Sequence, residues 1–442
     1  MYRIASFLIA FTVLVSACTV TTETSSPPVG LKAESAMVVS AHPLASQVGV
    51  QILQQGGNAV DAAVAVQFAL AVVYPVAGNI GGGGFMISRM HNGELAALDF
   101  RERAPLSGDR NMYLDSLGEV IPKSSTLGHL AAGVPGSVAG MYEAHQRYGT
   151  LPWSELVQPA INLAAQGFTL TEKESRSYNS HRDRFLEANT IAPQFLLKEA
   201  GWNPGDSVVM EDLAWTLTQV RDAGMEGFYT GPVAEKIVAE MDRGSGMISL
   251  EDLAQYEAVW REPVVFPYRG HRIISMPPAS SGGIALAQLL QMVEGHPVAE
   301  MEPHSPEKIH LVTEAERRVY ADRATHLGDT DFYPVPRASL IAAEYADERM
   351  ATFDPSQATD SDEVFSGEFS GSPSEETTHF SIVDAQGNAV SITTTLNGGM
   401  GSHVVVDGAG FILNNEMDDF SIKPGYPNAY GLIGAFTRLY SI

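Results

Sequence analysis

The 442-residue sequence predicts an α+β fold, and three observations support that prediction. Residues 85–100 and 377–397 each contain two short runs of strand-forming residues on either side of a turn with glycine, which is typical of a β-hairpin. Residues 133–350 instead carry apolar side chains three and four positions apart, which indicates helices. With 45% apolar residues and no evident linker in the middle of the chain, these elements favour one large unit of antiparallel sheet and helices.

Residues 1–17 predict a signal peptide that ends just before Cys18, the single cysteine of the chain. A positive start is followed by an apolar run over 4–15, which is too short for an ordinary transmembrane helix. The ending Val-Ser-Ala-Cys resembles a bacterial lipobox, in which the cysteine is lipidated after cleavage; ordinary cleavage beside an incidental cysteine is the alternative. Residues 18–35 follow as a polar tether rich in threonine, serine and proline. We therefore expect a lipoprotein on the periplasmic side of the bacterial cell envelope, held at the membrane only through its lipid.

The charge balance argues against a nucleic-acid partner. The chain has 27 Lys and Arg residues against 52 Asp and Glu, a formal net charge of −25, whereas binding to phosphates needs a basic surface. A single cysteine excludes an intramolecular disulfide and a thiolate metal cluster, and the 12 histidines lack the spacing of metal ligands. The sequence therefore predicts no metal centre and no cofactor.

The stretch after the tether predicts a strand followed by two helices. A short apolar strand at 37–40 precedes a helix that continues to Gln55 and is ended by two glycines. Asn58 is a suitable N-cap for the next helix, 59–73, whose small residues favour close packing. Glycines at 78–84 then provide a turn into the first hairpin.

Two further features lie between the hairpins. A strand at 270–276 leads into a turn that contains Ser-Ser-Gly-Gly and then into a helix from Ile284. The segment 352–376 is rich in serine, glycine, proline and acidic residues and shows little periodicity. We expect this segment to be exposed and flexible, and it ends directly before the second hairpin.

The side chains of the second hairpin select its register. A three-residue loop at 385–387, with its glycine in the left-handed conformation, pairs Phe380 with Ile392 and gathers the apolar side chains on one face. A two-residue loop would shift the register by one residue and mix apolar with polar side chains on each face. The three-residue register also places Thr395 directly opposite Thr377 on the polar face.

The polar face of this hairpin has two interpretations: it is the solvated side of a half-buried sheet, or it is a site of chemistry. A cut between Glu376 and Thr377 would make Thr377 a free N-terminus, with its hydroxyl beside its own α-amine. The pKa of an α-amine, about 8, lets it act as general base at neutral pH, so one residue supplies both nucleophile and base. The hydroxyl of Thr395 is expected where it can hydrogen-bond the Thr377 side chain.

Several motifs, taken together, resemble the γ-glutamyltranspeptidases. They occur in the family's order between about residue 36 and residue 434. The motifs lie at 36–71, 81–86, 99–105, 276–283, 377–381, 395–397 and 413–421. A match at so many separate places is not expected by chance.

The resemblance implies an αββα four-layer sandwich of the N-terminal-nucleophile hydrolase type. It implies a precursor that cleaves itself into a large-subunit region, 36–376, and a small-subunit region, 377–442. It also implies that Thr377 is the nucleophile and Thr395 its hydroxyl partner, with Glu376 and Thr377 forming the cleavage site. The reaction would move the γ-glutamyl group of glutathione and other γ-glutamyl compounds to water, amino acids or peptides through a threonyl ester.

The resemblance also implies a set of substrate-binding side chains. Arg101 is expected on the α-carboxylate of the substrate, because a guanidinium grips a carboxylate with two hydrogen bonds; an ion pair with Asp99 or Glu102 is the alternative. The substrate's α-amino group is expected to lie among Asn397, Glu416 and Asp419. Residues 423–430, which include Tyr430, resemble the family's lid over the γ-glutamyl pocket.

The resemblance stops at Gly434. Family members continue through a paired-serine motif that binds the substrate carboxylate and a Gly-Gly pair that supplies the oxyanion hole, and neither follows here. Because one oxyanion-hole donor is typically worth about 2.7–4 kcal/mol, we expect a truncated member with an incomplete small-subunit part and no γ-glutamyl hydrolysis. The alternatives are a related acylase for glutaryl-type amides and a non-catalytic lipoprotein fragment that binds amino acids. Arg101 with Asp419 suits a zwitterionic head group and favours the γ-glutamyl enzyme over the acylase.

Overall fold

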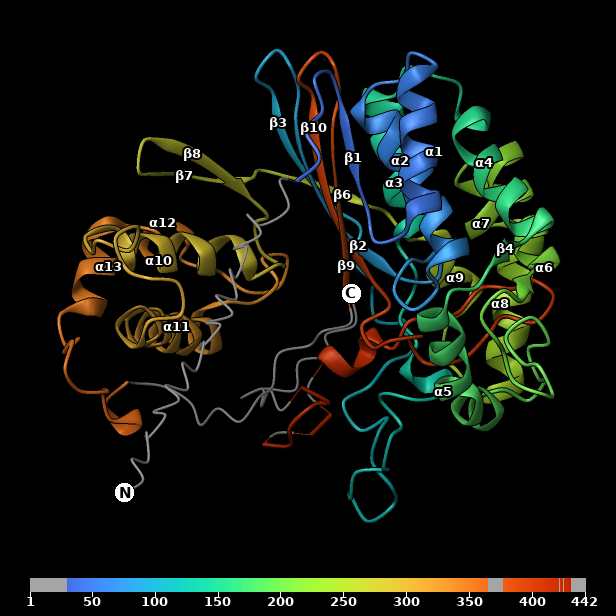
Figure 1. The fold of residues 1–442 in the computed structure, drawn as a ribbon. Coiled ribbons are helices and arrows are strands. Elements are labelled where there is room, and N and C mark those ends of the chain that lie inside the picture. Colours follow the sequence, from blue (N-terminus) through green and yellow to red (C-terminus); the bar gives the residue numbers. More distant parts are fainter. Residues whose placement is uncertain (1–29, 365–376, 421, 424, 431–442) are drawn as a thin grey trace, which may run out of the picture. The chain divides into compact units, whose positions relative to one another are not determined.

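The computed structural model describes residues 30–364, 377–420, 422–423 and 425–430. Its main sheet has six strands in the order β1-β9-β10-β2-β3-β6, and every neighbouring pair is antiparallel (Figure 1). These strands are β1 (Met37–Val39), β2 (Gly83–Arg89), β3 (Leu95–Asp99), β6 (Val259–Arg261), β9 (Thr377–Val383) and β10 (Ala389–Thr395). Two small sheets pair β4 (Phe168–Thr169) with β5 (Ser207–Val208), and β7 (Val264–Tyr268) with β8 (His271–Ser275).

Helices form much of the rest of the described chain. Up to residue 254 they are α1 (Pro43–Gln54), α2 (Ala59–Val73), α3 (Ser137–Tyr148), α4 (Trp153–Gln166), α5 (Glu172–Ala188), α6 (Glu211–Ala223), α7 (Glu226–Tyr229), α8 (Gly231–Gly244) and α9 (Leu250–Ala254). They continue with α10 (Gly282–Glu294), α11 (Pro306–His326), α12 (Arg337–Leu340) and α13 (Ala343–Met350). Short 3-10 turns are η1 (His129–Ala131), η2 (Ser361–Glu363) and η3 (Glu416–Asp419).

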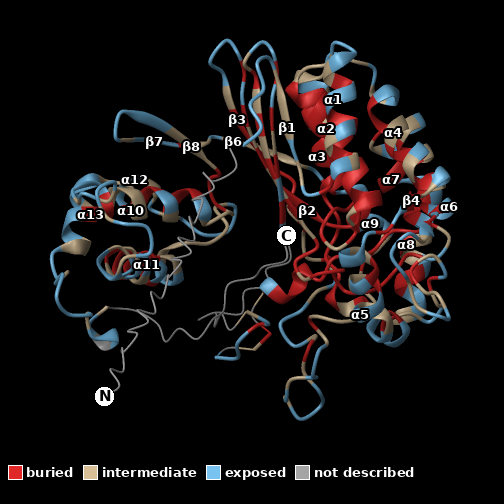
Figure 2. Cartoon of the chain, viewed as in Figure 1, coloured by how far each residue is buried: buried red, intermediate tan, exposed pale blue. Residues whose placement is uncertain are grey.

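The predicted strand and two helices after the tether are confirmed as β1, α1 and α2. The Asn58 side chain accepts hydrogen bonds from the N–H groups of Val60 and Asp61, and the Asp61 carboxylate accepts one from Asn58 N–H in return. This reciprocal cap fixes the start of α2. All 15 residues of α2 are buried, because its small side chains let α1, α3, α4 and the sheet pack closely around it (Figure 2).

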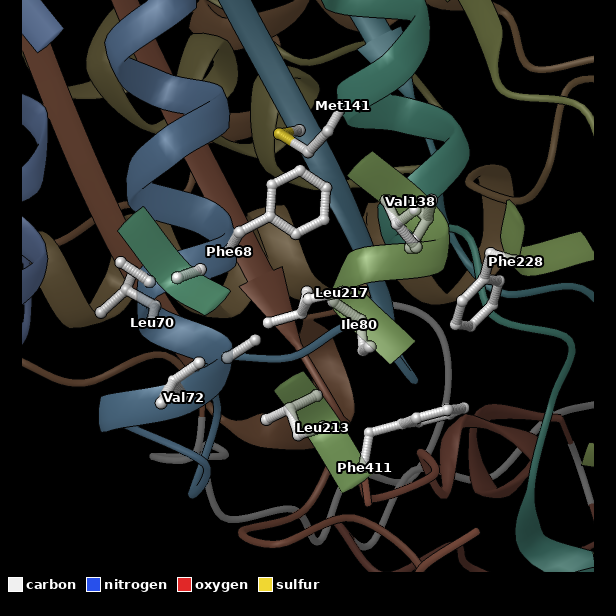
Figure 3. Close-up of a cluster of buried hydrophobic side chains, with 14 of the residues drawn as sticks. Phe68, Leu70, Val72, Ile80, Val138, Met141, Leu213, Leu217, Phe228 and Phe411 are labelled. Atoms are coloured by element: carbon white, nitrogen blue, oxygen red, sulfur yellow. The ribbon is translucent and has the colours of Figure 1, made fainter. Parts of the chain in front are cut away.

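The core around α2 includes the segment that follows the second hairpin. Phe68 of α2 lies in this core with Leu217 of α6, and both side chains are completely buried (Figure 3). Phe411 joins the same core, with its ring centroid 5.4 Å from that of Phe228. Residues on both sides of the predicted cleavage site therefore belong to one hydrophobic core.

The predicted register of the second hairpin is confirmed. Strands β9 and β10 pair Phe380 with Ile392 and Thr377 with Thr395. The loop glycine, Gly387, has a φ of 85°, the left-handed conformation that the three-residue loop requires. The alternation of side chains along both strands was therefore sufficient to define the pairing.

The middle of the chain is less uniformly helical than its periodicity predicts. The predicted strand at 270–276 is confirmed as β8, which pairs with β7 outside the main sheet. Strand β6 instead joins the edge of the main sheet, where Trp260 lies opposite Leu98 of β3. Helices α10, α11 and α13 enclose a separate small core that includes Met292, Leu311 and Val319.

The segment predicted to be flexible is only partly described. Residues 365–376, with the Glu376 side of the predicted cleavage site, lie outside the described residues. Thr359, near the start of the segment, is held on α11: its hydroxyl donates to Glu314 Oε2 at 2.5 Å and accepts from Arg318 Nη2 at 3.1 Å. Burial alone would raise the pKa of Glu314, but hydrogen bonds from Thr359, Arg318 and Arg317 lower it to about 2.

The signal-peptide and lipid-anchor predictions fall on residues 1–29, and Cys18 is therefore outside the described residues. Among the residues that the structure describes, no helix has the length and apolar character needed to cross a membrane. The same residues contain no group of three or more His, Cys, Asp or Glu side chains arranged to hold a metal ion.

Candidate active site

The two threonines singled out from the sequence are paired at the ends of two neighbouring inner strands of the main sheet. Thr377 is the first residue of β9 and is exposed, and its paired residue is Thr395 at the end of β10. Thr395 Oγ1 accepts a hydrogen bond from Asn397 N–H at 2.9 Å. In the described part of the chain no hydrogen bond joins the two threonine hydroxyls, so the expected contact between them is not formed in this structure.

A buried asparagine, missed by the sequence reasoning, holds the end of β10. Asn79 lies in the glycine-rich turn before β2 and is 3% exposed. Its Nδ2 donates to Thr395 O at 2.8 Å and to Thr394 Oγ1 at 3.0 Å. Its Oδ1 accepts from Gly82 N–H and from Ser137 Oγ. Because these four partners come from β10, the turn and α3, Asn79 fixes the strand that carries Thr395.

The turn glycines allow β2 to approach β10 closely. A Cβ on Gly82 would lie 2.1 Å from Thr395 O, and a Cβ on Gly84 would lie 2.2 Å from Thr393 O. Any side chain at either position would push β2 away from β10. The glycine run is therefore a packing requirement of the sheet beside the two threonines.

A cluster of opposite charges lies beside η3 and the end of β3. We call Arg101, Glu416 and Asp419 the clamp. Arg101 Nη2 donates to Glu416 Oε1 at 2.7 Å and also pairs with Asp419 Oδ2. The alternative predicted for Arg101, an ion pair with Asp99 or Glu102, is wrong: Asp99 Oδ2 instead accepts from Arg261 Nε at 2.7 Å.

Glu416 of the clamp and the neighbouring Glu102 lie in an environment that disfavours their ionised forms. Burial and repulsion from Asp419 and Asp418 raise the pKa of Glu416 to about 7, although the attraction of Arg101 opposes the shift. Burial and the nearby Glu416 raise the pKa of Glu102 well above its usual range. Both carboxyl oxygens of Glu102, and Oε2 of Glu416, are buried without a hydrogen-bond partner in the described structure. A cationic group bound here would meet several unsatisfied acceptors.

The predicted lid residue lies against one of the predicted ligand-binding side chains. Tyr430 Oη donates to Asn397 Oδ1 at 2.6 Å, and Asn397 Nδ2 donates to Asn415 O at 2.9 Å. The buried Asp418 accepts from Ser125 Oγ at 2.6 Å and from the N–H of the residue before Tyr430 at 2.8 Å. Hydrogen bonds to Asn397 and to Asp418 therefore hold this end of the lid segment.

The clamp opens into a cavity of about 460 Å³. One wall consists of the clamp with Glu102 and Arg103, and a second wall comes from the turn before α10 and the end of α11. The second wall includes Ala279, Ser280, Ser281, Arg323, Leu327 and Asp329. Thr377, Thr395 and Asn397 do not line this cavity, so the structure brings the clamp together but leaves the two threonines outside it.

Comparison with known proteins agrees with the sequence resemblance. The family model for gamma-glutamyltranspeptidase matches residues 45–439. A glutathione hydrolase proenzyme of Pseudomonas sp. (strain A14) is 47% identical over 412 residues, which is 92% of this chain and 71% of that protein. An acylase ACY 1 proenzyme of Pseudomonas sp. (strain SE83) is 38% identical over 395 residues, covering 88% of this chain and 70% of that protein. The crystal structure of Helicobacter pylori gamma-glutamyltranspeptidase superposes with a TM-score of 0.73 at 46% identity, covering 75% of this chain and 95% of that chain.

The antiparallel sheets and helices agree with the predicted α+β fold, and the neighbours define a hydrolase of the N-terminal-nucleophile class. Within that class, the chain belongs to the γ-glutamyltranspeptidase family of enzymes.

Proposed function

We propose that the chain is the precursor of a γ-glutamyltransferase and glutathione hydrolase that cleaves itself between Glu376 and Thr377. The observation that carries this proposal is the pairing of Thr377, the first residue of β9, with Thr395 in the same sheet as the strand that leads to the clamp. Membership of the γ-glutamyltranspeptidase family and similarity to glutathione hydrolase proenzymes support it.

The proposed reaction uses Thr377 as both nucleophile and base. Its free α-amine accepts the hydroxyl proton while Oγ1 attacks the γ-carbonyl carbon of the donor. A C–O bond forms, the γ-amide C–N bond breaks, and the proton passes to the leaving nitrogen. The γ-glutamyl ester then reacts with water to release glutamate, or with the amine of an amino acid or peptide to form a new γ-glutamyl amide; in both cases the threonine hydroxyl is restored.

Thr395 is the proposed hydrogen-bond partner of the nucleophile. Its Oγ1 already accepts from Asn397 N–H, and a hydroxyl that accepts one bond still has its own proton to donate. A donor beside Thr377 Oγ1 would stabilise the oxygen as it loses its proton. This role requires a rotation of the Thr377 or Thr395 side chain from its position in the described structure.

The clamp is proposed to bind the α-amino acid head of the donor. In the structure Arg101 pairs with both Glu416 and Asp419, while Glu416 Oε2 has no partner among the described residues. A zwitterionic head can exchange these contacts for two new ones, with its α-carboxylate on Arg101 and its ammonium among Asn397, Glu416 and Asp419. Tyr430, bonded to Asn397, would cover the bound head as part of the lid.

The head-group preference separates the proposed enzyme from an acylase. The similarity to an acylase supports that alternative. A glutaryl group, however, has no ammonium to donate hydrogen bonds to the unpartnered carboxyl oxygens of Glu416 and Glu102. We expect a mature enzyme to hydrolyse a γ-glutamyl anilide with a kcat/KM at least about tenfold above that for the matching glutaryl anilide, since one charge-assisted contact is worth that much.

The measurement uses the 442-residue chain beside the same chain extended by a family C-terminus. Preference for the glutaryl anilide would establish the acylase instead. Turnover by the extended chain alone would agree with the inactivity expected from the sequence, whereas equal turnover by both would contradict that expectation. Binding of amino acids without turnover by either chain would leave a non-catalytic binding protein.

We also propose that the protein is a lipoprotein on the periplasmic side of the cell envelope, attached through Cys18. Because the lipid is the proposed anchor, Cys18→Ser is expected to move the protein from the membrane fraction to the soluble periplasmic fraction. Fractionation with mass spectrometry of the N-terminal peptide measures both location and lipid. A wild-type protein that is soluble and carries no lipid would rule out this anchor.

A further inference from the structure

The second wall of the cavity carries a positive charge of its own. Arg323, near the end of α11, lines this wall, and its Nε donates to Ser281 Oγ at 3.1 Å. Among the described residues, no carboxylate lies within ion-pair distance of Arg323, although the whole chain has a net charge of −25. Asp329 shares the wall, but its Oδ1 accepts from Asp331 N–H, and burial raises its pKa.

Two serine hydroxyls line the same cavity as this guanidinium. Ser280 and Ser281 line the cavity with Arg323 and immediately precede α10. Ser280 Oγ accepts from Gly282 N–H at 3.2 Å, so its hydroxyl proton is available to a ligand. The partial positive charge at the N-terminus of the 13-residue helix α10 adds to that of Arg323.

A shared anchor fixes this wall relative to the clamp. Asp99 accepts from Arg101 N–H at 3.1 Å through Oδ1 and from Arg261 Nε at 2.7 Å through Oδ2. The other two nitrogens of Arg261 donate to both oxygens of Asp331, at 2.9 and 2.8 Å. Asp331 lies in the loop that follows α11, so the same arginine ties the end of that helix to the strand leading into the clamp.

We propose that Arg323, Ser280 and Ser281 form a second anion subsite, which binds the carboxylate at the far end of a γ-glutamyl peptide. The inference rests on the proposed function and extends it to the leaving group. Glutathione has two carboxylates and one ammonium, and the cavity is lined by Arg101, with Glu416 and Asp419 beside it, and by Arg323. The third guanidinium of the lining, that of Arg103, donates to Glu257 O at 3.0 Å. The volume of about 460 Å³ is within the range of small-molecule sites.

The subsite gives the enzyme a way to distinguish peptide donors from other γ-glutamyl amides. A donor whose amide nitrogen carries a free carboxylate would contact both walls, whereas an anilide would contact only the clamp. A purely structural role for Arg323, holding Ser281 before α10, makes a different prediction: its loss would lower stability and weaken all ligands equally.

The test compares ligands that share the γ-glutamyl head and differ only at the far end. Calorimetric binding to the 442-residue chain would use glutathione, glutathione with its C-terminal carboxylate converted to an amide, and a γ-glutamyl anilide. We expect glutathione to bind about tenfold more tightly than its amide, because a charge-assisted hydrogen bond typically contributes that much to affinity. Arg323→Gln should remove this difference and leave anilide binding unchanged.

The matched control is Arg337→Gln, because Arg337 is bonded to Glu262 O and does not line the cavity. It should retain the preference for glutathione, and melting temperatures of both variants would report any loss of stability. The subsite is overturned if Arg323→Gln weakens the binding of all three ligands equally, or if the unaltered chain shows no preference for the free carboxylate. Either result leaves the proposed binding of the γ-glutamyl head group unaffected. Failure of every ligand to bind, both to this chain and to the chain extended by a family C-terminus, overturns the proposed function and the subsite with it.

Discussion

Thr377→Ala is expected to yield a single uncut chain with no γ-glutamyl transfer. The substitution removes the hydroxyl that attacks both the peptide bond before residue 377 during maturation and the donor amide during turnover. In other hydrolases that use a covalent nucleophile, loss of that nucleophile lowers turnover by on the order of 10⁶-fold. Where the unaltered sequence matures, N-terminal sequencing of its smaller fragment should begin Thr-Thr-His-Phe, and the variant should show no such fragment on a denaturing gel.

Two neighbouring substitutions separate this chemistry from folding. Thr377→Ser keeps a hydroxyl beside the α-amine and should still cleave, more slowly because the side chain is less constrained. Thr393→Ala alters the same strand pair by removing only a hydroxyl that bonds His379 Nδ1 at 2.8 Å, and it should cleave like the unaltered chain. A fragment that starts at any other residue, or cleavage that survives in Thr377→Ala, would exclude Thr377 as the nucleophile.

Local patterns in the sequence were sufficient for the elements whose partners lie nearby. The register of β9 and β10 follows from side-chain alternation, because a shift by one residue would expose Phe380 and bury polar side chains. The start of α2 follows from Asn58, since that residue type satisfies backbone N–H groups that a helix leaves free. In both cases the contacts that decide the structure span fewer than about twenty residues.

Such local patterns could not predict the contacts between distant parts of the chain. Asn79 bonds the end of β10 more than 300 residues later, and its only signal was a polar residue within a glycine-rich turn. Arg323 has no local feature that connects it to Arg101, and only the folded chain brings both side chains to the lining of one cavity. The grouping of Arg101, Glu416 and Asp419 in one site was available only through the family resemblance, and the ion pairs that join them were not predicted.

Arg101→Met is expected to weaken the binding of γ-glutamyl ligands by at least about 30-fold. The substitution removes the cation that is proposed to bind the α-carboxylate, and it also leaves the carboxyl groups of Glu416 and Glu102 without their compensating charge. Both effects act against a zwitterionic head. Calorimetric titration of a γ-glutamyl anilide into a Thr377→Ala background measures the loss without turnover, and Arg176→Gln, on the exposed surface of α5, is the control.

The pH dependence of that titration distinguishes the clamp from a general loss of structure. With Glu416 at a pKa of about 7, the ammonium of the ligand meets a neutral carboxyl at low pH, so affinity should fall as the pH is lowered from 8 to 6. Because the attraction of Arg101 lowers the pKa of Glu416, Arg101→Met should raise that pKa further and move the midpoint of the profile to higher pH. A midpoint that stays in place or moves to lower pH would show that Arg101 and Glu416 do not act together on the bound head group.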